Sequence, residues 1–78
     1  MAELTTILAD MVKAIVTKPD EVVIKEDTKG DEIVLTLTVA PEDMGKVIGK
    51  HGKIAHSLRL VMKAAAGRIG KKLTVDIR

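Results

Sequence analysis

The chain of 78 residues carries a formal net charge of +2, is 46% hydrophobic, and contains no cysteine, phenylalanine, tyrosine or tryptophan. This length supports one domain at most, and the lack of cysteine excludes disulfides and thiolate metal sites, as suits a reducing cytoplasm. No apolar run is long enough to span a membrane and charges interrupt the first residues too often for a secretory signal, so we expect a cytoplasmic protein without membrane contact.

An amphipathic helix is predicted first, over residues 3–17. Pro19 ends it, because the residue before a proline disfavours the helical conformation. Two strands follow, Glu21–Glu26 and Ile33–Val39, and the polar segment between them carries Gly30 and indicates a hairpin loop. The helix prediction depends on apolar residues at spacings of three and four: Leu4, Ile7, Leu8, Met11, Val12 and Ile15.

The second half of the chain begins with a short predicted helix. Pro41 marks its first turn, and the acids Glu42 and Asp43 favour the positive end of the helix dipole. After Gly52 a longer helix is predicted, with Gly70 at its carboxyl-terminal cap. The apolar face of that helix comprises Ile54, Leu58, Val61, Met62, Ala65 and Ile69.

The last predicted strand alternates apolar and polar residues over 73–77. Because each strand has one apolar face, we expect an α+β fold of two layers, a three-stranded sheet with three helices on one face. The first two strands pair as a hairpin. The helical crossover before the last strand favours parallel pairing with the second strand, which makes the sheet mixed. The predicted order is α-β-β-α-α-β.

Charge is divided unevenly along the chain. Up to Asp43 the net charge is −6, and from Met44 onward it is +8, with no carboxylate between Asp43 and Asp76. Such an imbalance favours a polyanionic partner. The alternative is a solvated basic helix with no partner, although helices of that kind usually intersperse acids among the bases.

The segment 47–55, VIGKHGKIA, places two glycines three residues apart around Lys50 and His51. A helix amino terminus exposes unpaired N–H groups and about half a positive charge, so an anion is favoured just before Lys53. We expect Gly49 and Gly52 to let a phosphate approach the backbone and to permit positive φ. The alternative is a plain turn between two helices, with its lysine and histidine in water.

Other phosphate-binding loops do not fit the sequence. A Walker A loop has four residues between its first glycine and Gly-Lys, whereas Gly45 and Gly49 enclose three, and His51 follows Lys50. A dinucleotide-binding fingerprint follows a strand, but here a helix precedes the loop. His51 and His56 have no neighbouring cysteine or acid for a metal site, and no carboxylate is placed as a base. We expect no enzyme activity, no cofactor and no small-molecule substrate.

The residues Ile48-Gly49-Lys50-His51-Gly52 resemble the I-G-x-x-G signature of KH domains, and residues 1–78 as a whole resemble the small single-domain bacterial KH proteins of the KhpA family. The resemblance implies a type II KH fold that binds single-stranded RNA through this loop, with an RNA-chaperone-like role. It also implies a homodimer, or a heterodimer with a larger KH protein of the KhpB (Jag) type. The RNA-binding residues that it implies are Lys46, Ile48, Gly49, Lys50, His51, Gly52, Lys53 and Ile54.

One feature of the long helix supports self-association. Leu60 points about 120° away from Ile54 around that helix, next to the small residues Ser57, Ala64 and Gly67. Such a strip seats another helix, either the first helix of the same chain or a second subunit. We predict a homodimer. The alternative function is a protein-interaction subunit that docks a larger KH partner, with RNA binding incidental.

Overall fold

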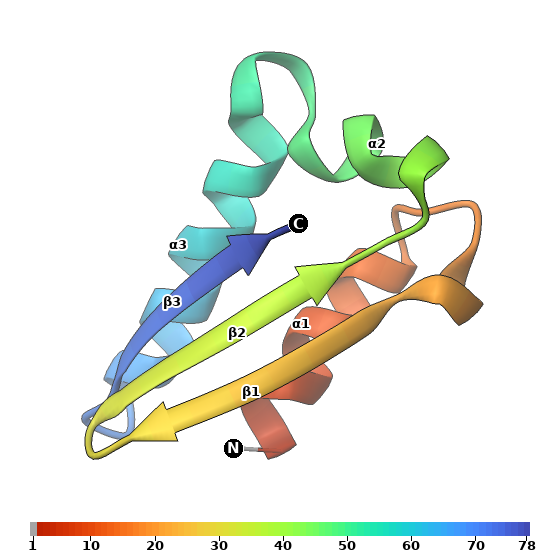
Figure 1. The fold of residues 1–78 in the computed structure, drawn as a ribbon. Helices are drawn as coiled ribbons and strands as arrows, with labels where there is room; N and C mark the ends of the chain where they lie inside the picture. The colour runs from red at the N-terminus through yellow and green to blue at the C-terminus, as the bar shows by residue number, and fades with distance from the viewer. Residues whose placement is uncertain (1) are drawn as a thin grey trace.

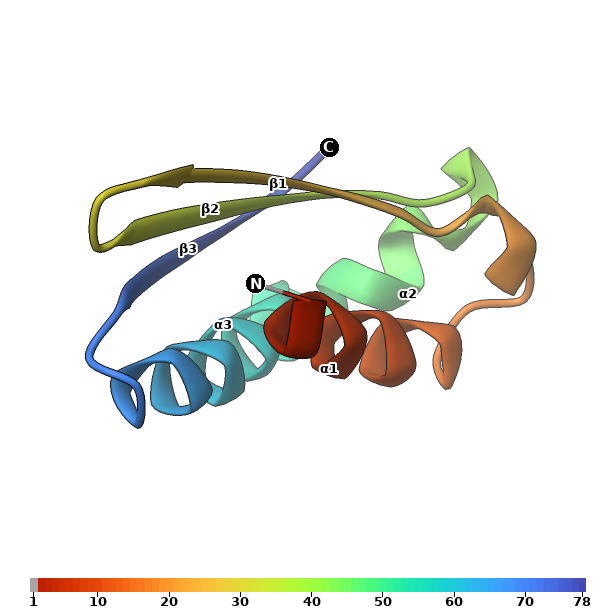
Figure 2. The same ribbon diagram turned by 90° about the horizontal axis from the view of Figure 1, so that it is seen from below.

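The computed structural model describes residues 2–78 and has two layers, a three-stranded sheet and helices that lie on one of its faces (Figure 1, Figure 2). The strands are ordered β1-β2-β3, with β1 antiparallel and β3 parallel to β2. The predicted α+β class, element order and mixed sheet are confirmed. The elements are α1 (Ala2–Lys13), β1 (Val23–Lys29), β2 (Glu32–Thr38), α2 (Met44–Ile48), α3 (Lys53–Gly67) and β3 (Lys72–Ile77), with short 3-10 turns η1 (Pro19–Glu21), η2 (Pro41–Asp43) and η3 (Lys50–Gly52).

The hairpin is longer and its turn tighter than the sequence predicted. β1 begins two residues later than expected and continues to Lys29, because its ladder with β2 runs unbroken from the pair of Val23 and Thr38 to the pair of Lys29 and Glu32. Only two residues, 30 and 31, remain for the turn, and the φ of +58° at Gly30 fits a two-residue hairpin.

The core lies between the sheet and the helices. α1 buries one residue per turn, and β2 buries every second residue, as the periods of helix and strand require. Each fully buried leucine or isoleucine side chain stabilises the fold by about 2 kcal/mol, so this interface holds α2 and α3 in place. The core is aliphatic throughout: Leu4, Leu8, Val12, Ile33, Leu35, Leu37, Val39, Val47, Leu58, Met62, Ala66, Leu73 and Val75.

The face that α3 turns to the core differs from the prediction. Val61 was assigned to the core but is 47% exposed, and Ile69, 45% exposed, lies beyond the last helical residue, Gly67. The apolar stripe of α3 is wide and meets two surfaces, the sheet on one side and α1 on the other. Periodicity does not tell which margin of such a stripe meets the sheet. The residues of α3 that are buried are Ala55, Leu58, Met62 and Ala66.

The carboxyl-terminal cap of α3 is confirmed. Gly70 has a φ of +72°, its N–H donates to the carbonyl of Gly67 at 3.2 Å, and the N–H of Lys71 donates to the carbonyl of Ala66 at 3.0 Å. These two bonds make the Schellman motif that glycine favours at this position. They turn the chain from α3 directly into β3.

α1 ends at Lys13, four residues earlier than predicted. The N–H of Ile15 already bonds to the carbonyl of Val12, at 2.9 Å, which tightens the last turn. The chain is then held by a distant carboxylate: Asp43 Oδ1 accepts from the N–H and the hydroxyl of Thr17 at 2.9 and 2.7 Å, and Oδ2 accepts from the N–H of Lys18 at 3.0 Å. Asp43 was expected to interact with a helix dipole; its side chain is fully buried and ties the start of α2 to the segment that follows α1.

The hydrogen bonds to Asp43 favour its charged form. The backbone N–H of Thr17 is the largest cause, and together with the Thr17 hydroxyl and the N–H of Lys18 it holds the pKa of the carboxyl below its ordinary value of 3.8. A carboxyl whose pKa is lower in the folded state stabilises the fold above its unfolded pKa. That contribution is lost as the pH falls through the folded pKa.

We expect Asp43→Asn to lower Tm by about 5–10 °C at pH 7, because the amide nitrogen of asparagine cannot accept a bond from Thr17 or Lys18. The deficit relative to the wild type should narrow as the pH falls below 3.8, because Asp43 is protonated there in the unfolded chain and then, at its lower folded pKa, in the folded protein as well. Thermal melts followed by circular dichroism between pH 2.5 and 7 measure this, with the exposed Asp20→Asn as control. A deficit that stays constant with pH contradicts the assignment.

Candidate nucleic-acid interface

The loop between α2 and α3 is built on two glycines with positive φ. α2 ends when the N–H of Gly49 bonds to the carbonyl of Gly45 at 2.9 Å, and Gly49 then adopts φ +75° and ψ 178°, a conformation nearly restricted to glycine. The N–H of Gly52 returns to the carbonyl of Gly49 at 3.2 Å, and Gly52 has φ +73° and ψ 13°. The predicted positive φ at both glycines is confirmed, and the two helices are joined by a single tight turn.

The two glycines have different steric surroundings, which the sequence did not predict. A Cβ on Gly49 would lie 2.6 Å from Cγ1 and 2.9 Å from Cβ of Ile54. Gly49 therefore leaves room for a neighbouring side chain, and the expectation that it also lets a phosphate approach the backbone stays a prediction. A Cβ on Gly52 would meet no atom within 4 Å, so at Gly52 the backbone is open to an approaching ligand.

The tip of the loop presents polar groups to solvent. Lys50 and His51 are exposed, and among residues 2–78 the N–H of neither residue has a protein acceptor. His51 adopts φ 58° and ψ 26°, the left-handed region that is uncommon for residues other than glycine. Such strain is frequent at ligand-binding positions, because the surrounding structure must hold it in place. Two unpaired donors and two basic side chains thus meet at one exposed turn.

The remaining predicted site residues lie on different sides of the loop. Lys46 is exposed on α2, and Ile48 at the end of α2 is 40% exposed. Lys53 and Ile54 line an apolar groove between α1 and α3, together with Met11 and other residues of both helices. The structure therefore gathers Ile48 to Gly52 at the loop, whereas Lys53 and Ile54 point toward α1.

A second basic flank was not singled out from the sequence. His56, Arg59 and Lys63 follow Gly52 at spacings of three or four residues, so they share one side of α3. This side faces β3, since Arg59 Nε donates to the carbonyl of Val75 at 3.2 Å. That bond uses one of the five N–H donors of the guanidinium group. Their spacing of three or four residues along a predicted helix could have identified this flank from the sequence.

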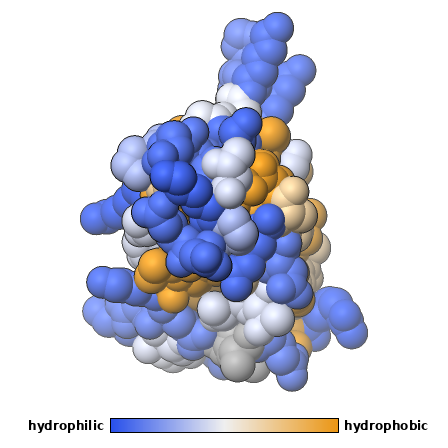
Figure 3. All heavy atoms as spheres, turned by 90° about the vertical axis from the view of Figure 1, so that its right-hand side faces the viewer, coloured by the Kyte–Doolittle hydropathy of each residue, from blue (hydrophilic) through white to orange (hydrophobic). Residues whose placement is uncertain are grey.

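The lysines at and beside the loop are not neutralised by acids of the described chain. In the part of the chain that the structure describes, no ion pair includes Lys46, Lys50 or Lys53, whereas Lys18 bonds to Glu42 in the acidic half. Figure 3 shows hydrophilic side chains standing out at the top of the molecule, the end that carries the loop in Figure 1, with apolar surface directly below them. Lys46, Lys50 and Lys53 thus bring three cations without an ion pair among residues 2–78 to this end of the molecule.

Two other kinds of feature are absent from the described residues. Nowhere in 2–78 do three histidine, cysteine, aspartate or glutamate side chains gather as metal ligands would. None of the helices within this range has the length and hydropathy that a bilayer crossing requires.

Comparisons with known proteins point to one family. Residues 5–77 match the family model described as the KH domain of KhpA and KhpB. The chain is 51% identical over 71 residues to the RNA-binding protein KhpA of Clostridium acetobutylicum, an alignment that covers 91% of the chain and 95% of that protein. It is 49% identical to the RNA-binding protein KhpA of Clostridium perfringens and 47% identical to that of Caldanaerobacter subterraneus subsp. tengcongensis, each over 77 residues and 99% of both chains.

Proposed function

The chain belongs to the KhpA/KhpB family of KH domains, and from this premise we propose that it binds single-stranded RNA by gripping the sugar-phosphate backbone with the GKHG loop between α2 and α3. The observation that carries the proposal is the pair of exposed N–H groups on Lys50 and His51, which have no protein acceptor among the described residues. The open side of Gly52 lets a phosphate reach them. The role is binding without catalysis.

The residues around the loop have different roles in RNA binding. Lys46, Lys50 and His51 supply charge and hydrogen-bond donors to phosphate and sugar, which hold a strand irrespective of its sequence. Ile48, 40% exposed, offers an apolar surface to a base. Lys53 adds charge at the start of α3, and Ile54 acts through its packing against Gly49. A strand held in this way is bound without aromatic stacking, as expected of a chain that has no aromatic rings.

Sequence-tolerant binding of this kind suits an RNA-chaperone-like role, because contacts to the backbone are the same in every transcript. The cytoplasm is the compartment in which we place it, and a chain without cysteine is compatible with reducing conditions there.

The salt dependence of binding tests the phosphate grip. If two to four phosphates are contacted, log K should fall against log salt with a slope of roughly −1.4 to −2.8, since each phosphate on a single strand contributes about −0.7. Fluorescence anisotropy with a labelled RNA at 50–300 mM salt measures the slope. Affinity that does not change with salt contradicts a grip on phosphates.

We further propose a homodimer that associates through the outer side of α3. Leu60 is 54% exposed, so more than half of its side chain is left uncovered by its own chain. Its neighbours Ser57, Ala64 and Gly67 are small and exposed, and Val61 extends the strip toward the apolar groove beside α1. Small residues around an apolar one allow two helices to approach closely. A larger KH partner of the KhpB type would use the same strip. The exposure of Leu60 therefore also favours the alternative function, a subunit that docks such a partner.

Leu60→Glu should shift the dimer to monomers, raising the dimer Kd by about 30-fold or more, because a charge would be buried at the centre of the interface. Light scattering from 1 to 100 μM measures the mass. The control is Ile69→Glu, at a residue that is 45% exposed but outside this strip. A monomeric wild type over the whole range, or equal effects of both substitutions, counts against this interface.

A further inference from the structure

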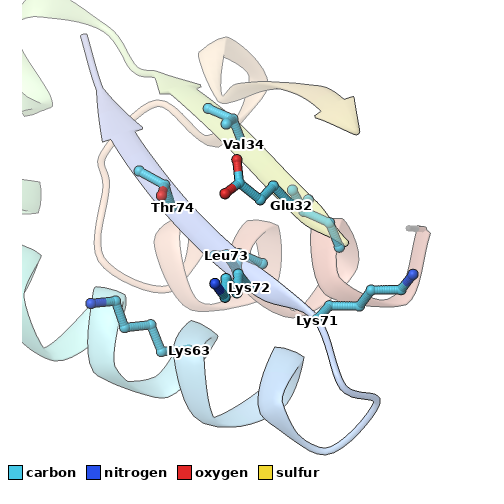
Figure 4. A pocket seen from close by; sticks show the side chains of 8 residues that line it. Glu32, Val34, Lys63, Lys71, Lys72, Leu73 and Thr74 are labelled. Carbon is cyan, nitrogen blue, oxygen red and sulfur yellow. The ribbon is translucent and has the colours of Figure 1, made fainter. Parts of the chain in front are cut away.

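A cavity of about 420 Å³ lies beside the carboxyl-terminal half of α3, whereas the GKHG loop lies at the amino-terminal end of that helix (Figure 1). Its volume is within the range of small-ligand sites, which begins at about 300 Å³. Figure 4 shows that its side chains come from β2, β3 and α3 and from Lys71, the residue before β3. The lining residues that the argument uses are Glu32, Val34, Lys63, Lys71, Lys72 and Thr74.

The floor of the cavity belongs to the open face of the sheet. Glu32 pairs with Lys72 across the parallel ladder, and Val34 pairs with Thr74 one step further along. These four residues alternate with the buried rows of β2 and β3, so their side chains point away from the helices. The floor therefore lies on the opposite face of the sheet from the apolar groove between α1 and α3, and Lys63 is the lining residue that α3 contributes.

The charges at this cavity favour an anion. Lys71 is occupied, since its Nζ lies 3.4 Å from Asp31 Oδ1. Lys63 and Lys72 take part in no ion pair within residues 2–78, although both line the same cavity. Two ammonium groups that face one space repel each other unless an anion lies between them. Lysine is a frequent ligand of phosphate.

The rest of the lining favours a ligand that is more than a phosphate. The Glu32 carboxylate accepts hydrogen bonds only, so a ligand that meets it must offer a donor, and inorganic phosphate offers few at neutral pH. Val34 and the Thr74 methyl group give an apolar floor. A nucleotide carries all three complements: a phosphate for the lysines, a flat base for the floor, and an exocyclic amino group for the carboxylate. Glutamate accepts from the N4 amino group of cytosine in the same way.

A row of cations on α3 links the loop to the cavity. His56, Arg59 and Lys63 form the flank of α3 that faces β3, so cations lead from Gly52 to the cavity. Lys63 comes eleven residues after Gly52, about 16 Å along the helix axis. A strand that is held at the loop and follows this flank arrives at the cavity.

We propose that this cavity, the distal nucleotide pocket, binds one nucleotide of the RNA strand, with its phosphate between Lys63 and Lys72 and its amino-bearing base against Val34 and Glu32. The inference rests on the proposed function, because the same strand occupies the GKHG loop. It predicts a footprint longer than the loop alone provides, and a preference at the distal position for cytosine or adenine over uracil.

The length dependence of RNA affinity tests the phosphate part. Wild-type protein should bind a ten-nucleotide RNA about 10-fold more tightly than a four-nucleotide RNA in fluorescence anisotropy. Lys63→Ala/Lys72→Ala should bind the four-nucleotide RNA as the wild type does, lose most of the gain with length, and reduce the salt slope on the longer RNA by about 0.7. The control Lys13→Ala/Lys25→Ala removes the same charge from α1 and β1 and should keep the gain.

Several results overturn the proposal. One is a length gain that survives in Lys63→Ala/Lys72→Ala, and another is an equal loss of affinity for both RNAs, which would assign the lysines to the loop. A wild type that binds neither RNA overturns the proposed function, and this inference with it. Binding of the short RNA by the wild type together with no gain for the long one overturns the distal nucleotide pocket alone.

A second experiment addresses the base. RNAs that share a constant four-nucleotide centre are flanked on both sides by cytidines or by uridines. The wild type should prefer cytidine flanks about 5-fold, and Glu32→Ala should remove the preference; equal binding of both RNAs by the wild type overturns the assignment of Glu32. In nuclear magnetic resonance spectra, cytidine monophosphate should shift the amides of Val34 and Thr74. Equal shifts with inorganic phosphate alone would identify an anion site and overturn the nucleotide.

Discussion

The double substitution Lys50→Asp/His51→Asp should abolish RNA binding while leaving the fold intact. Both side chains are exposed at the tip of the loop and make no hydrogen bond within the described chain, so their replacement removes no internal contact. Each charge-assisted hydrogen bond to phosphate contributes about 1.5–3 kcal/mol, and the new carboxylates also repel the strand. A loss of about 3 kcal/mol or more is about 100-fold or more in Kd.

The measurement is anisotropy on a short single-stranded RNA, with circular dichroism melts to verify folding. Lys25→Asp/Lys29→Asp on β1 is the matched control, because it lowers the net charge by more than the loop substitution does but lies on the opposite edge of the sheet from β3. The control should weaken binding only slightly. If the loop variant is folded and binds RNA as the wild type does, the loop is not the element that binds the sugar-phosphate backbone.

Gly49→Ala should destabilise the protein by about 3 kcal/mol or more. Two costs add: φ +75° with ψ 178° is a backbone region that side chains avoid, at about 1–3 kcal/mol, and the new methyl group would overlap Ile54, at about 1–3 kcal/mol. Chemical denaturation measures the free energy of unfolding. Gly49→Ala/Ile54→Ala should be less destabilised than the sum of its two single variants, by about 1 kcal/mol, because the shorter side chain removes part of the overlap.

Two other glycines provide controls for this prediction. Gly45→Ala lies in α2 with open space around it, and it should stabilise the protein by about 0.5–1 kcal/mol, as alanine does in a helix. Gly52→Ala keeps the cost of positive φ, about 1–2 kcal/mol, without a clash. Its larger effect should be on RNA affinity, since its methyl group would stand in the open space before the loop. A Gly49→Ala variant as stable as Gly52→Ala would contradict the role assigned to Ile54.

These expectations divide the I-G-x-x-G signature by function. Gly49 is required by the packing of the protein itself, whereas Gly52 keeps the backbone accessible. The side chains of Lys50 and His51 are exposed and make no hydrogen bond within the described chain, so the fold does not require these two residue types. A pair of glycines that looks equivalent in a motif thus serves two needs, one in the folded chain and one in the complex.

Much of the architecture followed from local patterns. The alternation in Ile33, Leu35 and Leu37 identified β2, and Gly70 identified the end of α3, because side-chain period and positive φ are properties of a few neighbouring residues. The tight turn at the hairpin and the early end of α1 did not follow, since the first depends on pairing with β2 and the second on Asp43, which is distant in the sequence.

The features of the candidate sites also fall into two groups, those that the sequence predicts and those that depend on the tertiary structure. The sequence by itself determined the element order, the excess of cations after Met44 and the position of the GKHG loop at the head of the long helix, because these depend on composition and on the spacing of neighbouring residues. Only the tertiary structure decided that Asp43 is buried, that a side chain on Gly49 would strike Ile54, and that Glu32 and Val34 meet Lys72 and Thr74 at one cavity. Each of these depends on which surfaces meet when the helices pack on the sheet, and contacts between distant segments leave no mark in a local pattern.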